Sequence, residues 1–301
     1  MNTSNKLNMT MLCDFYELTM GNGYFKAGYK DRITHFDLYF RSVPDKGGYA
    51  IAAGLEQVID YLRDLHFDPE DIQYLRDRKI FDEAFLEYLA NFKFTGDIYA
   101  IPEGTPVFPH EPILTVRAPA IQTQLLETYL LLTINHQSLI ATKANRIVRA
   151  AKGRTVLEFG SRRAQGSSGA IDGARAAFIG GCNGTACTIS DQLYGVPAGG
   201  TMAHAWVRYH DAEFEAFKGL PDLLRGLPRK RRPAGGYLQY PEERHPRRHP
   251  SLQRRAQAPG HHQVRDSPGL RRYGLPDQGG PPYAGRGRLD RVQDYRVQLS
   301  G

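Results

Sequence analysis

Four polar residues lie just past short strand-like segments in the second half of the chain, where their side chains could do chemistry: Arg162, Asn183, Thr201 and His204. Residues at this position in α/β barrels face the active site. His204 follows a Gly-Gly turn, which would leave its imidazole exposed at the end of a strand. The spacing therefore predicts one site assembled from several strand ends.

Parallel β/α units are the elements that would bring these residues together. Residues 155–159 form a short apolar run typical of a strand, and small residues over 170–179 are typical of a helix. A second helix is predicted at 189–193, beyond a turn that contains Gly180 and Gly181. Strands that alternate with helices indicate a parallel sheet or barrel.

The first half of the chain has a different pattern. Apolar residues at helical spacing predict helices over 55–65, 69–75, 82–92 and 120–151. Shorter apolar runs between prolines and glycines predict strands at 98–101, 106–108 and 113–116. The fold class we predict is α/β: an N-terminal α+β domain over 1–140, then the first part of an α/β barrel over 141–218.

Composition and charge limit the classes of protein to consider. The chain has 301 residues, of which 41% are hydrophobic and 24% charged, and this excludes a disordered, collagen-like or disulfide-scaffold protein. The net charge of +7 would favour an acidic partner such as nucleic acid. However, residues 1–220 hold 22 Lys and Arg against 25 Asp and Glu, whereas residues 221–301 hold 17 against 7. The excess positive charge therefore belongs to the last 81 residues alone.

Cysteine content and hydropathy predict the compartment. Cys13, Cys182 and Cys187 include no Cys-x-x-Cys pair, which is typical of the reducing cytosol. Residues 1–9 lack the apolar stretch of a signal peptide. Because no uncharged apolar run approaches the ~18 residues of a membrane span, we expect a soluble cytoplasmic protein without a membrane partner.

Seven short segments, in order between residue 9 and about residue 218, resemble nicotinate phosphoribosyltransferases. They are 14–20 (Asp-Phe-Tyr-Glu-Leu-Thr-Met), 40–44 (Phe-Arg-Ser-Val-Pro), 52–55 (Ala-Ala-Gly-Leu), 102–104 (Pro-Glu-Gly), 126–128 (Leu-Glu-Thr), 158–166 (Glu-Phe-Gly-Ser-Arg-Arg-Ala-Gln-Gly) and 200–204 (Gly-Thr-Met-Ala-His). The resemblance implies a barrel of the type II phosphoribosyltransferase kind, with an N-terminal domain assembled from separated segments.

The resemblance also implies a reaction. Nicotinate would displace pyrophosphate from 5-phosphoribosyl 1-diphosphate to give nicotinate mononucleotide, in the salvage route to NAD. The hydrolysis of ATP would be coupled through a phosphohistidine, and Mg²⁺ would neutralise the departing pyrophosphate. Relatives often pair so that one subunit's N-terminal residues complete the other's site, so we consider a homodimer.

Each candidate residue receives an expected role from the resemblance. His204 would be phosphorylated, because a neutral imidazole attacks phosphorus and forms a labile phosphoramidate. Tyr16, Phe159 and Arg162 would lie against the nicotinate ring, and Thr201 near its carboxylate. Phosphate-binding roles would fall to four further residues: Arg41, Arg163, Gly180 and Gly181. No residue is assigned as a metal ligand.

Every one of these residues also fits an ordinary structural role. The alternatives are a hydrogen-bonded loop residue for His204, packing for Tyr16 and Phe159, a helix cap for Thr201, a surface ion pair for Arg41, solvation for Arg162 and Arg163, and a simple turn for Gly180 and Gly181. Relatives often carry an acid where this chain has Asn183, so we expect no defined role for that residue.

The resemblance ends near residue 218, where the composition changes abruptly. Residues 221–301 contain 16 Arg against one Lys, with 11 Pro and 11 Gly. The codons that encode 224–236, 236–245, 264–276 and 292–299 permit family-like sequences when each is read with the same shift of one nucleotide. We therefore expect a frameshift near 219–223, an out-of-frame and disordered tail over 219–301, and an inactive chain.

Two other functions remain open from the sequence. A phosphoribosyltransferase that uses nicotinamide or quinolinate would share the same framework. A binding module that contacts nucleic acid through the basic tail is the alternative from another class. We expect no specific nucleic-acid partner, because the tail is better explained by a shifted reading frame.

Overall fold

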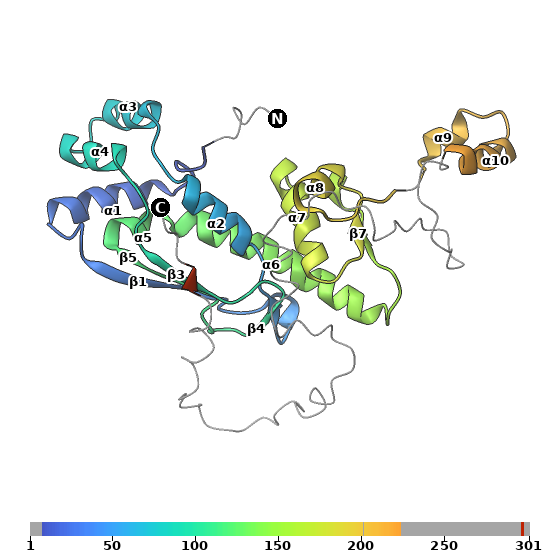
Figure 1. The fold of residues 1–301 in the computed structure, drawn as a ribbon, viewed down its shortest axis with the longest axis horizontal. Helices are drawn as coiled ribbons and strands as arrows, with labels where there is room; N and C mark the ends of the chain where they lie inside the picture. The colour runs from blue at the N-terminus through green and yellow to red at the C-terminus, as the bar shows by residue number, and fades with distance from the viewer. Residues whose placement is uncertain (1–7, 201, 224–295, 298–301) are drawn as a thin grey trace, which may run out of the picture.

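The computed structural model describes residues 8–200, 202–223 and 296–297 (Figure 1). The helices are α1 (Phe15–Lys26), α2 (Leu55–Asp64), α3 (Pro69–Asp77), α4 (Glu83–Ala90), α5 (Ala120–Leu125), α6 (Glu127–Ala150), α7 (Ser167–Ile179), α8 (Thr188–Tyr194), α9 (His204–Arg208) and α10 (Glu213–Leu223). The strands are β1 (Ile33–Leu38), β2 (Ala50–Ile51), β3 (Asp97–Ala100), β4 (Pro106–Val107), β5 (Leu114–Pro119), β6 (Leu157–Glu158), β7 (Gly184–Thr185) and β8 (Arg296–Val297). Single turns of 3-10 helix lie at η1 (Pro44–Lys46) and η2 (Ser161–Arg163).

The N-terminal part is built on an antiparallel sheet of order β1-β5-β3-β8. Strand β5 pairs with β1 on one side, with Phe36 opposite Val116, and with β3 on the other, with Ile98 opposite Val116. Alternate residues of β5, namely Leu114, Val116 and Ala118, are buried on one face of this sheet. This alternation is what a sheet with one covered face requires.

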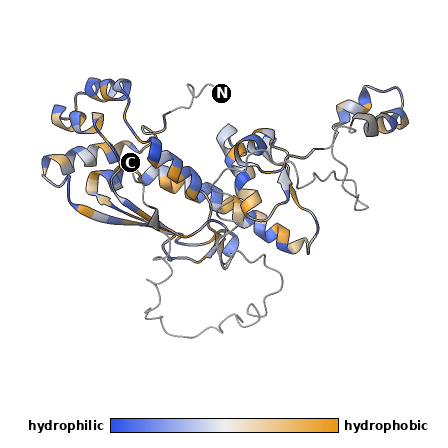
Figure 2. Cartoon of the chain, in the orientation of Figure 1, coloured by the Kyte–Doolittle hydropathy of each residue, from blue (hydrophilic) through white to orange (hydrophobic). Residues whose placement is uncertain are grey.

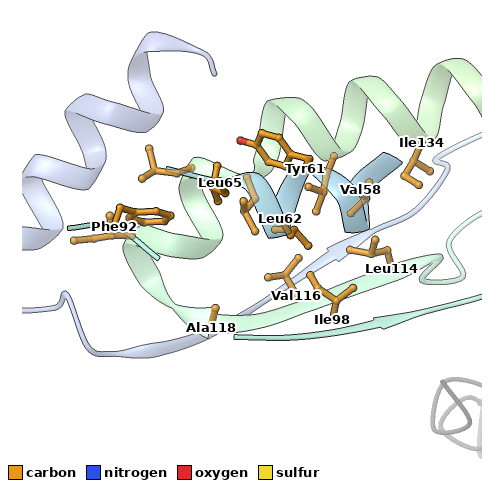
Figure 3. Packing of buried hydrophobic residues seen from close by; sticks show 14 of the residues in the cluster. Val58, Tyr61, Leu62, Leu65, Phe92, Ile98, Leu114, Val116, Ala118 and Ile134 are labelled. Carbon is orange, nitrogen blue, oxygen red and sulfur yellow. The ribbon is translucent and has the colours of Figure 1, made fainter. Parts of the chain in front are cut away.

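Helix α2 covers that buried face. Val58 and Leu62 of α2 lie over Ile98, Leu114 and Val116 of the sheet (Figure 3). All five side chains are at most 5% exposed, and burial of each aliphatic side chain stabilises the fold by roughly 1.5–3 kcal/mol. Figure 2 shows hydrophilic and hydrophobic residues interleaved along α2 and α6, as expected of helices that pack through one face.

The predicted helices over 55–65, 69–75 and 82–92 are confirmed as α2, α3 and α4. Helix α3 begins with a capping box: Asp71 accepts a hydrogen bond from the Asp68 backbone N–H at 3.0 Å, and Pro69 takes the first helical position. Helix α1 was not predicted. Its interior contains Gly21, Asn22 and Gly23, which weaken the helical pattern, and its position is fixed by packing against α5.

The single helix predicted over 120–151 is wrong in one respect, because the chain forms two helices with a break at Leu126. The backbone N–H of Thr128 donates to Oε1 of Glu17 at 3.1 Å. A backbone donor engaged by a side chain from α1 marks the start of a new helix, since the first N–H groups of any helix have no partner within it. The break is therefore the result of a tertiary contact.

The second part confirms the predicted β/α alternation. Strands β6 and β7 are parallel, and Thr185 also bridges in parallel to Ala198. Helix α7 connects β6 to β7 and packs along α6 (Figure 1). The helix predicted at 170–179 is α7, which begins earlier at Ser167, and the helix predicted at 189–193 is α8.

A buried ion pair joins the two parts of the molecule. The two terminal guanidinium nitrogens of Arg175 in α7 donate to the two carboxylate oxygens of Glu103, at 2.9 and 2.7 Å. Glu103 also accepts the backbone N–H groups of Gly54 and Leu55 at the start of α2, at 2.7 and 2.9 Å. Arg175 in turn donates to Gln137 of α6 at 3.2 Å. The N-terminal sheet, α6 and α7 are therefore held in one arrangement.

Helices α9 and α10 stand away from the remainder of the fold in Figure 1. The Trp206 indole N–H donates to the carbonyl oxygen of Ala216 at 2.9 Å and holds the two helices together. Among the described residues, no helix combines the length and the apolar character needed to cross a membrane. The tail predicted to be disordered over 219–301 begins inside helix α10, which continues to Leu223, and Arg296 and Val297 form β8, so the prediction of disorder is wrong for these residues. Residues 224–295 and 298–301 lie outside the described residues.

Candidate active site

A cavity of about 1180 Å³ lies at the carboxyl ends of the parallel strands. Its lining includes three residues predicted from the sequence: Phe159, Arg162 and His204. The remaining lining residues come from the segments after β7 and before α9, and from α8, α9 and α10: Ala186, Thr188, Asp191, Ala198, Gly199, Gly200, Met202, Ala203, Val207, Arg208, Glu213 and Phe217. Phe159 and His204, which are 45 residues apart in the sequence, thus line the same cavity.

A hydrogen-bond network ties the strand ends together beneath the cavity. Oε2 of Glu158 accepts the hydroxyl of Thr185 at 2.6 Å, and that hydroxyl oxygen accepts the Cys187 backbone N–H at 3.0 Å. The other carboxylate oxygen of Glu158 accepts the backbone N–H of Gly160. Because Glu158 directly precedes Phe159, this network fixes the loop that carries the aromatic side chain. Sequence reasoning assigned Glu158 no role, although a charged residue inside an apolar strand was a usable signal.

The cavity offers an aromatic face and charges of both signs. The Phe159 ring is 42% exposed, so a planar ligand could stack on it. Arg162, Arg208 and His204 supply groups that bind anions, and Asp191 and Glu213 supply carboxylates. His204 is the first residue of α9 and is exposed. An exposed aromatic ring and cationic side chains are groups of the kinds that bind planar rings and anions.

Asp191 also helps to shape the cavity wall. Its Oδ2 accepts the Ala198 backbone N–H at 3.3 Å, while Gly199 N–H donates to the Thr185 carbonyl oxygen at 2.8 Å. These bonds hold the segment before His204 against β7. Thr201, predicted near the substrate carboxylate, lies outside the described residues.

Asn183 does not occupy the position predicted for it. We expected it just past a strand, but it directly precedes β7 at the opposite end. Its backbone N–H donates to the Val156 carbonyl oxygen at 2.8 Å, and its Oδ1 accepts the Val156 N–H at 2.9 Å. These two bonds bind the amino ends of β6 and β7, so Asn183 has a structural role far from the carboxyl ends.

The predicted phosphate-binding residues are dispersed. Arg41 lies in an exposed bend after β1, and Arg163 is exposed in η2. Gly180 packs on α6, since a Cβ there would lie 2.4 Å from the Ala141 carbonyl oxygen. Gly181 has φ of +107°, a conformation that favours glycine. None of the four is among the residues that line the cavity.

Tyr16 lies in the first turn of α1 and is not a lining residue of the cavity. Its ring is 42% exposed. Partial burial, a hydrogen bond to Glu127 and the nearby carboxylates together raise the pKa of Tyr16 to about 12. Its hydroxyl therefore stays protonated at neutral pH and acts as a donor.

Among the described residues, no three His, Cys, Asp or Glu side chains are close enough to form a metal site. A Mg²⁺ ion bound mainly by substrate phosphates needs only one or two protein carboxylates. Asp191 and Glu213 are the two carboxylate residues in the lining of the cavity.

Comparison with known proteins gives a consistent result. The family model described as nicotinate phosphoribosyltransferase (NAPRTase) N-terminal domain matches residues 11–135. The chain is 42% identical over 213 residues to a nicotinate phosphoribosyltransferase of Mycobacterium tuberculosis, covering 71% of this chain and 46% of that protein. A Bacillus subtilis nicotinate phosphoribosyltransferase is also 42% identical, over 70% of this chain and 43% of the relative. The chain thus spans less than half the length of these relatives.

Solved structures extend the similarity to the fold. The crystal structure of human nicotinic acid phosphoribosyltransferase superposes with a TM-score of 0.62 at 37% identity, over 65% of this chain and 40% of that one. A nicotinate-nucleotide pyrophosphorylase from Pyrococcus furiosus superposes with a TM-score of 0.58 at 26% identity, over 74% and 49%. The predicted fold class is confirmed.

Proposed function

The chain belongs to the nicotinate phosphoribosyltransferase family, and from this premise we propose that its site is built to convert nicotinate and 5-phosphoribosyl 1-diphosphate into nicotinate mononucleotide and pyrophosphate. The reaction would serve NAD biosynthesis by salvage in the cytoplasm. The observation that carries the proposal is the convergence of Phe159, Arg162 and His204 on one cavity at the parallel strand ends.

The cavity residues suit the charges of this reaction. Phe159 offers its exposed ring to the planar base, and Arg162 offers a guanidinium to the base carboxylate. As the C1–O bond of the sugar breaks, the sugar gains oxocarbenium character and pyrophosphate gains charge. Arg208 would stabilise that charge, and Mg²⁺ held by Asp191 and Glu213 would supply further neutralisation.

His204 is proposed as the residue that ATP phosphorylates. A neutral imidazole nitrogen would attack the γ-phosphorus, forming a P–N bond while ADP departs. In a chain with the restored reading frame, the His204→Asn variant should lose acid-labile label from γ-labelled ATP. The matched control is His210→Asn, because His210 bonds to the Trp206 carbonyl oxygen at 2.8 Å and does not line the cavity. Label retained in His204→Asn would contradict the assignment.

We propose a homodimer in which Tyr16 of one protomer completes the cavity of its partner, because Tyr16 does not line the cavity of its own chain. Mixing Tyr16→Ala with Phe159→Ala should restore nicotinate binding, since a mixed dimer contains one intact site. Sedimentation of both variants as monomers, or no recovery on mixing, would contradict this arrangement.

The remaining roles follow the resemblance. We propose that Thr201 contacts the carboxylate of nicotinate. Phosphate groups would be contacted by Arg41, Arg163, Gly180 and Gly181.

The tail bears on whether this chain turns over substrate. We propose that residues 219–301 are encoded out of frame and that the 301-residue chain is inactive. The test is to sequence the coding DNA and to assay this chain beside a frame-restored chain, with nicotinate, nicotinamide or quinolinate as the base. We expect nicotinate mononucleotide from the restored chain alone. Product from another base would replace the substrate assignment, and turnover by the 301-residue chain would remove the proposed inactivity.

A further inference from the structure

The first turn of α1 is tied to the first turn of α6 by Glu17 and Thr128. Oε1 of Glu17 accepts both the hydroxyl and the backbone N–H of Thr128, at 2.5 and 3.1 Å. The same Thr128 hydroxyl oxygen accepts the backbone N–H of Asp14 at 3.1 Å. The Asp14 carbonyl oxygen then accepts the Glu17 N–H at 2.9 Å. These four bonds form a closed circuit between two segments 111 residues apart.

Tyr16 lies inside this circuit. Asp14, two residues before it, and Glu17, the residue after it, both form hydrogen bonds with Thr128, so a shift of the backbone that carries the ring would disturb those bonds. The Tyr16 hydroxyl interacts with Glu127, the residue before Thr128. The first turn of α6 therefore determines the position of the Tyr16 backbone and contacts the far end of its side chain.

The circuit includes an unfavourable feature that packing alone does not require. Glu17 is fully buried, and within the described part of the chain its Oε2 has no hydrogen-bond partner. A buried carboxyl group with an unsatisfied oxygen is destabilising. The hydroxyl of Thr128 links Glu17 to the Asp14 backbone, because it accepts a hydrogen bond from the Asp14 N–H and donates one to the Glu17 carboxylate.

We propose that Glu17 and Thr128 are positioning residues for Tyr16, fixing its exposed ring in the orientation in which it meets nicotinate. The nicotinate contact rests on the proposed function above, whereas the orientation of the ring does not. Loss of the Thr128 hydroxyl would leave Asp14 N–H without its acceptor and Glu17 without its donor. The Tyr16 ring would then sample several orientations.

The test uses the 301-residue chain labelled with 3-fluorotyrosine, with the Tyr16 resonance assigned by its absence in Tyr16→Phe. Thr128→Val removes the hydroxyl at nearly constant volume, and Thr128→Ser restores it. Thr142→Val is the matched control. Thr142 is buried on the same helix, about 21 Å along its axis, and its hydroxyl oxygen likewise accepts a backbone N–H, from Ile51 at 2.8 Å.

We expect Thr128→Val to shift or broaden the Tyr16 fluorine resonance and to weaken nicotinate binding by about five- to tenfold. Thr128→Ser should restore both, and Thr142→Val should change neither. An unchanged Tyr16 resonance in Thr128→Val, or an equal change in Thr142→Val, would overturn the proposal. Nicotinate binding is measured in the frame-restored chain and its variants. If the frame-restored chain fails to bind nicotinate, the proposed function fails, and the fluorine spectra of the 301-residue chain alone decide whether Thr128 positions the ring.

Discussion

Two buried glutamates show how single side chains acquire different properties from their surroundings. The Glu103 carboxylate is paired with the Arg175 guanidinium and accepts hydrogen bonds from two backbone N–H groups. Glu17 is held only by Thr128 and the start of α1, and burial raises its pKa although the Thr128 hydrogen bonds lower it. The second carboxyl group is therefore sensitive to pH.

The raised pKa of Glu17 predicts a pH-dependent stability. The folded state holds the Glu17 proton more tightly than the unfolded chain, whose pKa is about 4.3. This contribution to stability is complete below the unfolded pKa and is lost as pH rises through the folded pKa. The glutamine in Glu17→Gln stays neutral at every pH. As pH rises from 4.5, the free energy of unfolding of this variant should therefore increase relative to that of the unmodified chain.

Urea unfolding between pH 4.5 and pH 8 measures this difference. Glu83→Gln is the control, because the hydrogen bond from Arg76 lowers the pKa of Glu83 and the sign is reversed. The stability that the Glu83 carboxylate contributes is already present above its unfolded pKa of about 4.3, so the difference between that variant and the unmodified chain should stay nearly constant from pH 4.5 to pH 8. Parallel behaviour of the two variants would refute the account of Glu17.

At the scale of elements, the fold depends on where helices meet loops. Glu103 joins two segments that are far apart in the sequence, 52–55 and 102–104. Its carboxylate accepts hydrogen bonds from the backbone N–H groups at the start of α2. Helix α7 joins them through Arg175, which also lies 5.7 Å from the Tyr194 ring. The ion pair therefore helps to set the orientation of α7 relative to the sheet, together with the packing of α7 on α6.

Removing one partner of that pair should be costly. Arg175 is 2% exposed, so Arg175→Met would leave the Glu103 charge buried and uncompensated, with an expected loss of about 3–5 kcal/mol in the free energy of unfolding. Glu103→Gln should lose a similar amount. The double variant should be more stable than the sum of the single losses predicts, as measured by urea unfolding. Strict additivity would show that the two groups do not interact.

Gly180 provides a second prediction at this scale. A Cβ there would lie 2.4 Å from the Ala141 carbonyl oxygen and 2.8 Å from the Ala144 Cβ, so Gly180→Ala must separate α7 from α6. We expect a loss of about 1–3 kcal/mol. Gly23→Ala is the control, because nothing lies within 4 Å of its Cβ position; alanine in that helix should stabilise by up to about 1 kcal/mol. A Gly180→Ala variant as stable as the original chain would contradict the packing role.

At the scale of the whole molecule, the main hydrophobic core and the candidate site are built from different parts of the chain. The main core draws its buried residues from positions 18 to 134, whereas the cavity lies between residues 159 and 217. Tyr16 belongs to the first region and His204 to the second. Completion of the proposed site therefore requires either large movement within one chain or the second protomer that we propose.

The location of the core predicts how the molecule tolerates loss of its tail. A chain that ends at Leu223 keeps every residue of the main core, so its thermal unfolding should remain cooperative and its midpoint should change by only a few degrees. Circular dichroism at 222 nm measures the transition. Loss of the cooperative transition would show that residues 224–301 contribute to folding.

The sequence alone predicted several helices of the N-terminal part and the resemblance to nicotinate phosphoribosyltransferases. Apolar spacing produced α2, α3 and α4, because a helix that packs through one face repeats every three or four residues. Short ordered motifs identified the relatives and placed Phe159, Arg162 and His204 at strand ends. The break at Leu126 was not predictable, because it depends on Glu17, which is 111 residues from Thr128.

Only the tertiary structure decided which side chains meet. It brought Phe159, Arg162 and His204 to one cavity, left Tyr16 outside its lining and moved Asn183 to the opposite end of the strands. It also paired Glu103 with Arg175 across 72 residues. Helical and strand periodicity depend on neighbours within a few residues, whereas the partner of a buried charge is chosen by whichever distant segment folds against it.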